Sequence, residues 1–181
     1  MNFAACDFSL GDLLYEHKAP ANAQEIVMPG LDGDRDGGYI VRGAVHLLAA
    51  SGGAVYSLRP QGLTTDQTGR WIVEGGGYAT VALLQIIGPV NLTPGPIYMD
   101  FTTLIEAQRT IGGVASWRRF RTITKLHHNQ ISPYQLSYEA TGNWRETATN
   151  LTSLTLYSSV AGSILAGSCL QVFRTARKFP A

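Results

Sequence analysis

Charged residues and cysteines are scarce in this chain of 181 residues. Charged side chains make up 15% of it and hydrophobic ones 45%, which excludes a disordered tail. The two cysteines, Cys6 and Cys169, are too few for a disulfide framework and have no metal-ligand spacing. No apolar run reaches 18 residues, and Asp7 interrupts the apolar core that a signal peptide needs. We therefore expect a soluble protein, made and kept reduced in a cytoplasm, with no membrane partner.

Glycine is abundant, with 20 residues, and β-branched and aromatic side chains fill the segments between the turns. In residues 151–157 and 168–174 the apolar side chains alternate with polar ones, as in half-buried antiparallel strands. Only 10–18 and 104–109 have helical character. The predicted strands are 24–28, 39–49, 54–59, 70–74, 78–87, 97–103, 114–125, 134–140, 151–157 and 168–174. This pattern predicts an all-β sandwich or barrel.

The domain organisation that we predict is one compact body with short extensions. An acidic N-terminal arm spans residues 1–22, the β-domain spans 23–175, and a basic tail spans 176–181. The net charge is only +1, yet residues 1–36 hold seven acidic side chains against two basic ones. From Arg109 onward nine basic side chains stand against two acidic ones. This separation of charge would steer the acidic end of one protomer to the basic face of another, or the basic face to an acidic partner. The alternative is a solvated surface that is unevenly charged by chance.

The stretch GLDGDRDGGY places Asp32, Asp34 and Asp36 at alternate positions, as at positions 1, 3 and 5 of an EF-hand calcium loop. The bidentate acid at position 12 of that loop would be Gly43, which has no side chain, and the following YIVRG is typical of a strand. An EF-hand is therefore excluded, while a looser calcium site completed by carbonyls or distant residues stays open. We predict a tight turn, because Asp and Gly tolerate the backbone angles that turns require.

Catalytic and metal-binding patterns are otherwise missing from the sequence. Adjacent His127 and His128 would point to opposite faces of a strand, and no other spacing brings two of the four histidines together as zinc ligands. There is no G-x-S-x-G motif, and EGGGY is not followed by the Lys-Ser/Thr pair of a phosphate loop. No carboxylate pair is singled out for glycosidase chemistry. We predict no enzyme, no catalytic residue, no cofactor and no resident metal.

One basic stretch, WRRFRTITK, interleaves aromatic and positively charged side chains. Such a pattern fits base stacking and phosphate contacts in nucleic-acid binding, but tryptophan and arginine are also the favoured anchors of protein interfaces. A plain exposed strand is the remaining interpretation. We predict a protein interface rather than nucleic-acid binding. The predicted interface residues are Trp117, Arg118, Arg119 and Arg121.

Two parts of the chain, covering most of residues 30–174, resemble small structural domains of tailed bacteriophage particles. The front part is LDGDRDGGYIVRGAVHL followed by AVYSLRPQGLTT, and the closing part is ATGNWRETATNLTSLTLYSSVAGSILAGSCLQVFR. The matching closing residues are Gly142, Trp144, Asn150, Thr152, Ser153, Leu154, Gly167, Ser168, Leu170, Val172 and Phe173. The resemblance implies an antiparallel jelly-roll-like β-sandwich, commonly oligomeric, that serves as a capsid decoration or cement protein or as a tail-tip or fibre head.

Within this class a fibre would need a shaft, and the sequence contains no repeat that could form one. We predict a non-enzymatic virion protein, a capsid decoration or cement protein assembled in the host bacterial cytoplasm. Its partners would be the major capsid protein or other virion proteins, with a trimer or dimer of the chain itself. The alternative is a tail-tip or fibre head domain that binds host-surface carbohydrate. The aromatic side chains that would then hold the sugar are Trp71, Tyr134, Tyr138 and Trp144.

Overall fold

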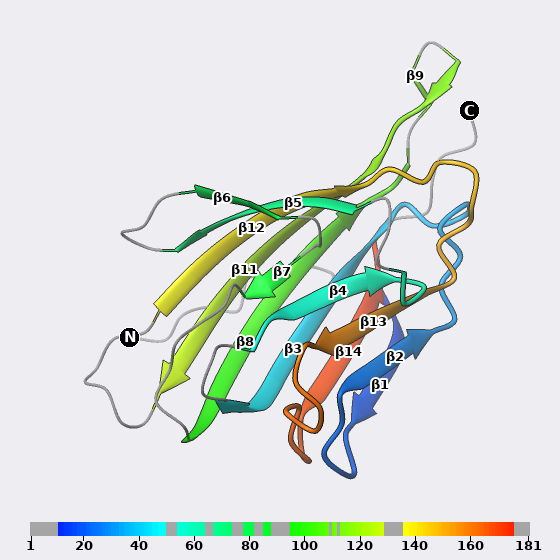
Figure 1. Ribbon diagram of the computed structural model, residues 1–181. Helices are drawn as coiled ribbons and strands as arrows, with labels where there is room; N and C mark the ends of the chain where they lie inside the picture. Colours follow the sequence, from blue (N-terminus) through cyan, green and yellow to red (C-terminus); the bar gives the residue numbers. More distant parts are fainter. Residues whose placement is uncertain are drawn as a thin grey trace, which may run out of the picture.

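The structure is a computed structural model. In the residues that it describes, all regular secondary structure is β-strand (Figure 1). The described ranges are 11–49, 54–63, 67–73, 78–81, 85–87, 95–108, 110–111, 113–128 and 136–175. The strands are β1 (Asp12–Lys18), β2 (Glu25–Pro29), β3 (Gly38–Ala49), β4 (Tyr56–Pro60), β5 (Gln67–Val73), β6 (Tyr78–Val81), β7 (Gln85–Ile87), β8 (Gly95–Glu106), β9 (Thr110–Ile111), β10 (Val114–Ala115), β11 (Arg118–His128), β12 (Leu136–Trp144), β13 (Ser153–Ser158) and β14 (Cys169–Arg174).

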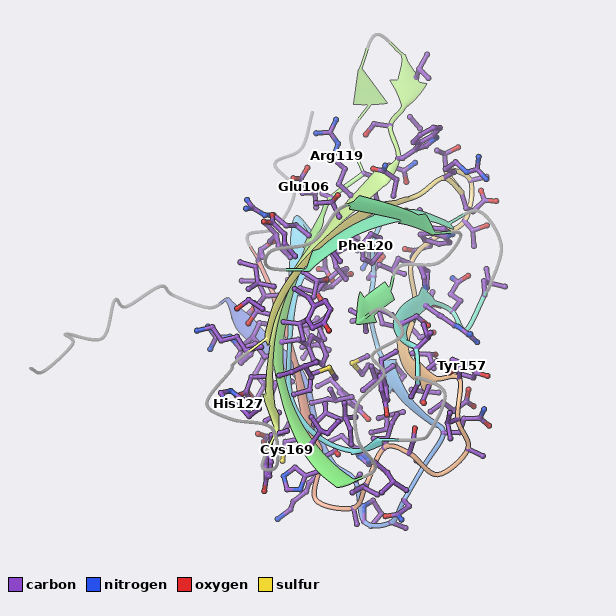
Figure 2. All side chains as sticks on the ribbon, turned by 60° about the vertical axis from the view of Figure 1, so that its left-hand side comes forward. Glu106, Arg119, Phe120, His127, Tyr157 and Cys169 are labelled. Atoms are coloured by element: carbon purple, nitrogen blue, oxygen red, sulfur yellow. The ribbon has the colours of Figure 1, made fainter. Side chains whose placement is uncertain are left out.

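Two antiparallel sheets form the body of the molecule. The large sheet has eight strands in the order β1-β14-β3-β8-β11-β12-β5-β6, and the small sheet has four in the order β2-β13-β4-β7. The large sheet is curved, and the small sheet lies on its concave side (Figure 2). Strands β9 and β10 form a separate short hairpin. The predicted all-β, antiparallel sandwich is confirmed.

The chain passes back and forth between the sheets. Strands β1, β3, β8 and β14 belong to the large sheet, while their sequence neighbours β2, β4, β7 and β13 belong to the small one. The pairs β5–β6 and β11–β12 then extend the large sheet beyond β8. The jelly-roll assignment remains a prediction with which this strand order is compatible.

The hydrophobic core lies between the two sheets, and every second side chain of a strand points into it. Leu154 and Leu156 of β13 and Leu170 and Val172 of β14 have no exposed surface, as the alternation predicts. Full burial of each such side chain contributes roughly 1.5–3 kcal/mol relative to exposure. The two strands that end the chain's closing part therefore supply both layers of the core.

Both predictions of helical character are wrong. Asp12–Lys18 is β1, an edge strand hydrogen-bonded to β14, with a register shift between Leu13 and Tyr15. The segment from Leu104 to Glu106 is the end of β8. In both places the hydrogen bonds come from distant strands, which outweigh a weak local preference. The predicted arm thus contains a strand of the sandwich, while residues 1–10 and the tail 176–181 lie outside the described residues.

The predicted strand 78–87 is two strands in different sheets. β6 (Tyr78–Val81) pairs with β5 in the large sheet, whereas β7 (Gln85–Ile87) pairs with β4 in the small one.

No helix that could span a membrane occurs in the part of the chain that the structure describes.

Candidate functional site

The aspartate-rich stretch is a turn between β2 and β3, as predicted. The N–H groups of Arg35 and Asp36 both donate to the carbonyl of Asp32, at 3.0 and 2.9 Å. Leu31 and Gly33 donate backbone hydrogen bonds to the residues that precede β13, which holds the turn against the closing part of the chain. The turn therefore joins the start of β3 to the segment that leads into β13.

Each of the three aspartates of this turn faces a different arginine. Oδ2 of Asp32 lies 3.5 Å from Nε of Arg35. Oδ1 of Asp34 lies 3.5 Å from Nη2 of Arg118, and Oδ1 of Asp36 lies 3.4 Å from Nη1 of Arg174. Among the described residues no group of three or more acidic, histidine or cysteine side chains is arranged to hold a metal ion. The aspartates act here as partners of arginines.

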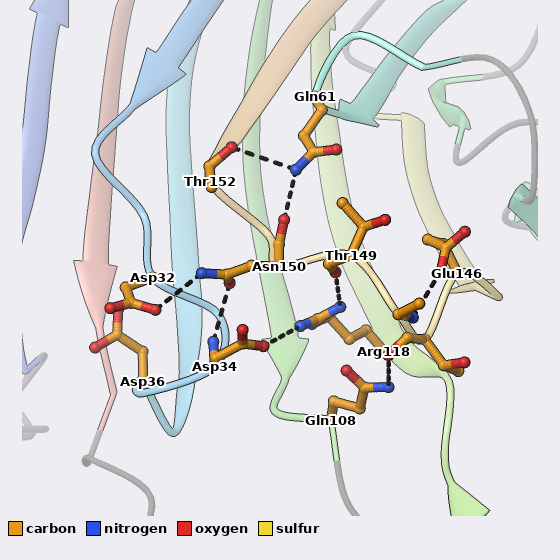
Figure 3. Close-up of polar contacts among 12 residues, drawn as sticks. Asp32, Asp34, Asp36, Gln61, Gln108, Arg118, Glu146, Thr149, Asn150 and Thr152 are labelled. Atoms are coloured by element: carbon orange, nitrogen blue, oxygen red, sulfur yellow. Dashed lines mark hydrogen bonds and ion pairs between the residues drawn. The ribbon is translucent and has the colours of Figure 1, made fainter.

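The side chain of Asn150 forms hydrogen bonds with two residues of the turn (Figure 3). Its amide nitrogen donates to Oδ1 of Asp32 at 3.0 Å, and its amide oxygen accepts the N–H of Asp34 at 3.0 Å. The carbonyl of Asn150 also accepts a hydrogen bond from the Gln61 side chain. Sequence reasoning placed Asn150 in the closing motif without a role. The signal that could have identified this role is the residue type, because an asparagine amide readily forms hydrogen bonds with backbone groups of turns.

Arg118 is buried beneath this turn, with 1% of its surface exposed. Its Nη1 donates to the carbonyl of Thr149 at 3.3 Å, and its guanidinium lies 5.2 Å from the ring centre of Trp144. Burial lowers the pKa of Arg118, while the nearby Asp34 opposes that shift. An arginine keeps its charge at neutral pH even so. The prediction that Arg118 lies at a surface contact is corrected by this burial: its neighbours are parts of its own chain.

The other predicted interface residues lie on the opposite face of β11. Trp117, which precedes β11, is 50% exposed, and Ile123 is 51% exposed. Arg119 and Arg121 are exposed as well, whereas Phe120 between them points into the core. Figure 2 shows Arg119 on the convex side of the large sheet and Phe120 on the concave side. We call the exposed set of this segment the outer strip; its members are Trp117, Arg119, Arg121, Ile123 and Lys125.

The outer strip is continued by the neighbouring strands. Leu104 of β8 is opposite Arg121 and is 41% exposed. On the other side, Nε of Arg121 pairs with Oε1 of Glu139 at 2.9 Å. An ion pair this exposed contributes little to stability, so its arginine remains available to a partner. The face thus combines exposed apolar side chains with basic ones, beside the carboxylates of Glu139 and Asp100.

Two of the four aromatic residues proposed for carbohydrate binding lie inside the protein. Trp144 and Tyr138 are buried in the core. The Trp71 side chain and all of Tyr134 lie outside the described parts. Of the histidines, His46 packs its ring 4.2 Å from that of Tyr98, and Nε2 of His127 lies 3.5 Å from Oδ2 of Asp100. The side chains of Tyr138 and Trp144 therefore cannot stack on a sugar in this fold.

Comparisons with family models, curated proteins and solved structures found no match to this chain. Evidence on function therefore comes from the chain's own residues. The described part presents two distinct features: a network of aspartates and arginines that links the turn to β11 and β14, and the outer strip, which faces solvent.

Proposed function

We propose that this chain is a non-enzymatic structural protein of a bacteriophage virion, a capsid decoration or cement protein that binds the outer shell. The observation that supports this most directly is the outer strip, where arginines are exposed on one face of β11 and a tryptophan is exposed directly before it. The motif resemblance of the front and closing parts supplies the class of particle. Partners would be the major capsid protein or other virion proteins.

A sheet face suits adhesion for a physical reason. β11 is hydrogen-bonded along its length to β8 on one side and β12 on the other, so its backbone is held in place before binding. A preorganised surface loses less conformational entropy on association. Trp117 and the two exposed arginines supply the residue types that dominate interface energies. Positive charge favours an acidic patch on the shell.

Many weak contacts would then act together. A decorated shell presents numerous equivalent sites, and a homo-oligomer engages several of them at once. Stabilisation of the particle then grows with the number of copies bound, without a tight single contact.

The test is co-sedimentation of the purified chain with capsids assembled without it. We expect the wild type to pellet with the capsids and Arg119→Glu/Arg121→Glu to stay in the supernatant. The matched control is Arg35→Glu/Arg42→Glu, which changes the net charge equally at exposed positions, one in the aspartate-rich turn and one on β3, which β8 separates from β11. Arg118 is left unchanged, because substitution of a buried arginine would disturb the fold. Full binding by the Arg119/Arg121 variant would contradict the proposed surface.

The rival function, a tail-tip or fibre head that binds host-surface carbohydrate, has less support. Tyr138 and Trp144 are buried and so cannot stack on a sugar. Binding of the isolated chain to a glycan array, without binding to capsids, would favour the rival function over decoration. Catalytic turnover of a small molecule that is abolished by one substitution would contradict both.

A further inference from the structure

We infer that the short hairpin of β9 and β10 inserts into an apolar recess of the capsid shell. The inference rests on the proposed function and names the element of the chain that would anchor it. The outer strip begins where this hairpin ends, so the two would bind the same partner. The partner is therefore a protein surface with an uncharged recess beside the contact for the outer strip.

The hairpin stands clear of both sheets. In the described part of the chain, β9 and β10 pair with each other and with no other strand. Figure 1 and Figure 2 show them beyond the end of β8 and β11, projecting from the sandwich. A Cβ atom on Gly113, at the tip, would meet no atom within 4 Å apart from its chain neighbours. The tip is therefore free to enter a partner.

The hairpin is uncharged and exposes apolar side chains. Residues 110–117, TIGGVASW, include no acidic or basic side chain, and an arginine stands at each end of this stretch. Val114 is 70% exposed, and Trp117 is 50% exposed. Removing apolar surface from water is favourable, whereas burying a charge without a partner is costly. An uncharged recess is therefore the surface that suits this element.

Val114 has little cover within its own chain. Two residue pairs hold the hairpin together, Val114 with Ile111 and Ala115 with Thr110. A two-stranded hairpin without further packing is marginally stable in water, because it has no core. Burial of this valine therefore requires another molecule, and that contact would also make the hairpin more stable.

The hairpin continues the outer strip, and this continuity identifies the partner. Only Ser116 and Trp117 separate β10 from β11. Exposed apolar side chains follow one another from Ile123 on β11 through Trp117 to Val114, with exposed fractions of 51%, 50% and 70%. A protein that covers the strip as far as Trp117 also reaches Val114, which is close to it in the chain. The hairpin and the strip therefore form one contact with the shell.

The charges at the base of the hairpin favour a protein over a lipid surface. Ile105 of β8 is paired with Phe120 of β11, and the residues next to them, Glu106 and Arg119, are both exposed. Figure 2 shows both near the end of the sheet from which the hairpin projects. An acidic bilayer attracts an arginine but repels a carboxylate, whereas a protein surface can match both.

The experiment measures binding to capsids assembled without this chain. Val114→Asp places a charge on the hairpin at a position that is mostly exposed in the free protein, so we expect this variant to fold as the wild type does. Its affinity for the capsids in co-sedimentation should fall at least about tenfold, because the recess would have to bury the carboxylate. The matched control is Val27→Asp, the same change at a 48% exposed position of β2, which should bind as the wild type does.

The two possible failures are distinguishable. A wild type that stays in the supernatant would overturn the proposed function and this inference with it. A wild type that pellets, together with a folded Val114→Asp variant that pellets equally well, would overturn only the inference. Denaturation of both variants in urea establishes that they are folded.

A fluorescent label provides a second measurement that introduces no charge. In a background of Cys6→Ser and Cys169→Ser, a polarity-sensitive dye is attached to Val114→Cys. We expect its emission to shift to shorter wavelength when capsids are added, and the same dye on Val27→Cys to show no shift. The absence of a shift with capsids overturns the inference. A shift that appears instead when the chain alone is concentrated would assign the hairpin to a second copy, and one that appears only with vesicles of phosphatidylglycerol and phosphatidylcholine would assign it to lipid.

Discussion

The hydroxyl of Tyr39 donates a 2.7 Å hydrogen bond to Oδ2 of Asp36, and both residues are buried. The same hydroxyl accepts the N–H of Asp32 at 2.9 Å. The other carboxylate oxygen of Asp36 faces Arg174 of β14. Because Arg174 also contacts Asp12 of β1, one phenol group connects the aspartate turn to two strands of the large sheet. Sequence reasoning missed Tyr39, which it treated only as the first residue of a strand.

Removing this hydroxyl should destabilise the protein. Tyr39→Phe leaves the carboxylate of Asp36 and the N–H of Asp32 each without one hydrogen bond in a buried place. We expect the free energy of unfolding in urea to fall by about 1–3 kcal/mol. The matched control is Tyr98→Phe at a half-exposed position, which should change it by less than about 0.5 kcal/mol. Equal effects of the two substitutions would contradict the role of the Tyr39 hydroxyl.

Stability should depend on pH in the alkaline range. Burial raises the pKa of Tyr39, and the hydrogen bond to Asp36 raises it further. The folded state therefore keeps a proton that the unfolded state releases, so this stabilisation is complete below about pH 10 and is lost above it. We expect the free energy of unfolding to fall above about pH 10, with at most about 1.4 kcal/mol per pH unit from Tyr39. Urea titrations should show a shallower fall for Tyr39→Phe, and an unchanged slope would count against this assignment.

The sequence predicted the sandwich best where alternation was strict. In β13 and β14 each second side chain is apolar, and a period of two has no helical counterpart. In β1 the sequence DLLYEHK satisfies neither period clearly. Its state is decided by hydrogen bonds from β14, at the far end of the chain, which no local pattern reports.

For the candidate interface, the sequence predicts that neighbouring arginines lie on opposite faces of the strand, but not which of the two faces is buried. Alternation requires Arg118 and Arg119 to point to opposite faces of β11. Which one is buried depends on Asp34 and Trp144, whose positions follow only from the folded sheet. Arginine is seldom buried without a partner, so the exposed assignment of Arg118 was the default expectation.

Arg118 and Arg119 should therefore respond very differently to the same substitution. Arg118→Met removes the bond to the Thr149 carbonyl and the contact with Asp34, and we expect a loss of about 2 kcal/mol in the free energy of unfolding. Arg119→Met at the exposed neighbour should change it by less than about 0.5 kcal/mol. Denaturation in urea of both variants gives the comparison. Two equally stable variants would show that Arg118 contributes no net stability.

Calcium should leave the stability of this protein unchanged. A calcium site needs about six to eight oxygen ligands that converge on one point. Asp32, Asp34 and Asp36 are instead directed at three different arginines. Because only a ligand that binds the folded state raises the melting temperature, we expect equal Tm values in calcium and in EDTA. A rise in Tm with calcium that Asp34→Asn abolishes would identify a site at this turn.

Gly43 should be intolerant of a methyl group. It lies directly opposite Phe101 in the pairing of β3 with β8, and the Phe101 ring covers it so closely that a Cβ atom would overlap Cε1. We expect Gly43→Ala to lower the free energy of unfolding by about 1–3 kcal/mol through overpacking. Ala44→Val, one position along on the solvent face, should have an effect below about 0.5 kcal/mol.

The overlap of Gly43 with Phe101 can be tested separately from a general cost of changing a strand glycine. If the ring is the cause, shortening it must relieve the strain, so Gly43→Ala/Phe101→Leu should lose less stability than the sum of the two single variants. The expected coupling is at least about 0.5 kcal/mol, measured by a double-mutant cycle in urea. Strict additivity would mean that the Phe101 ring moves aside freely, and the cost of Gly43→Ala would then have to come from the backbone.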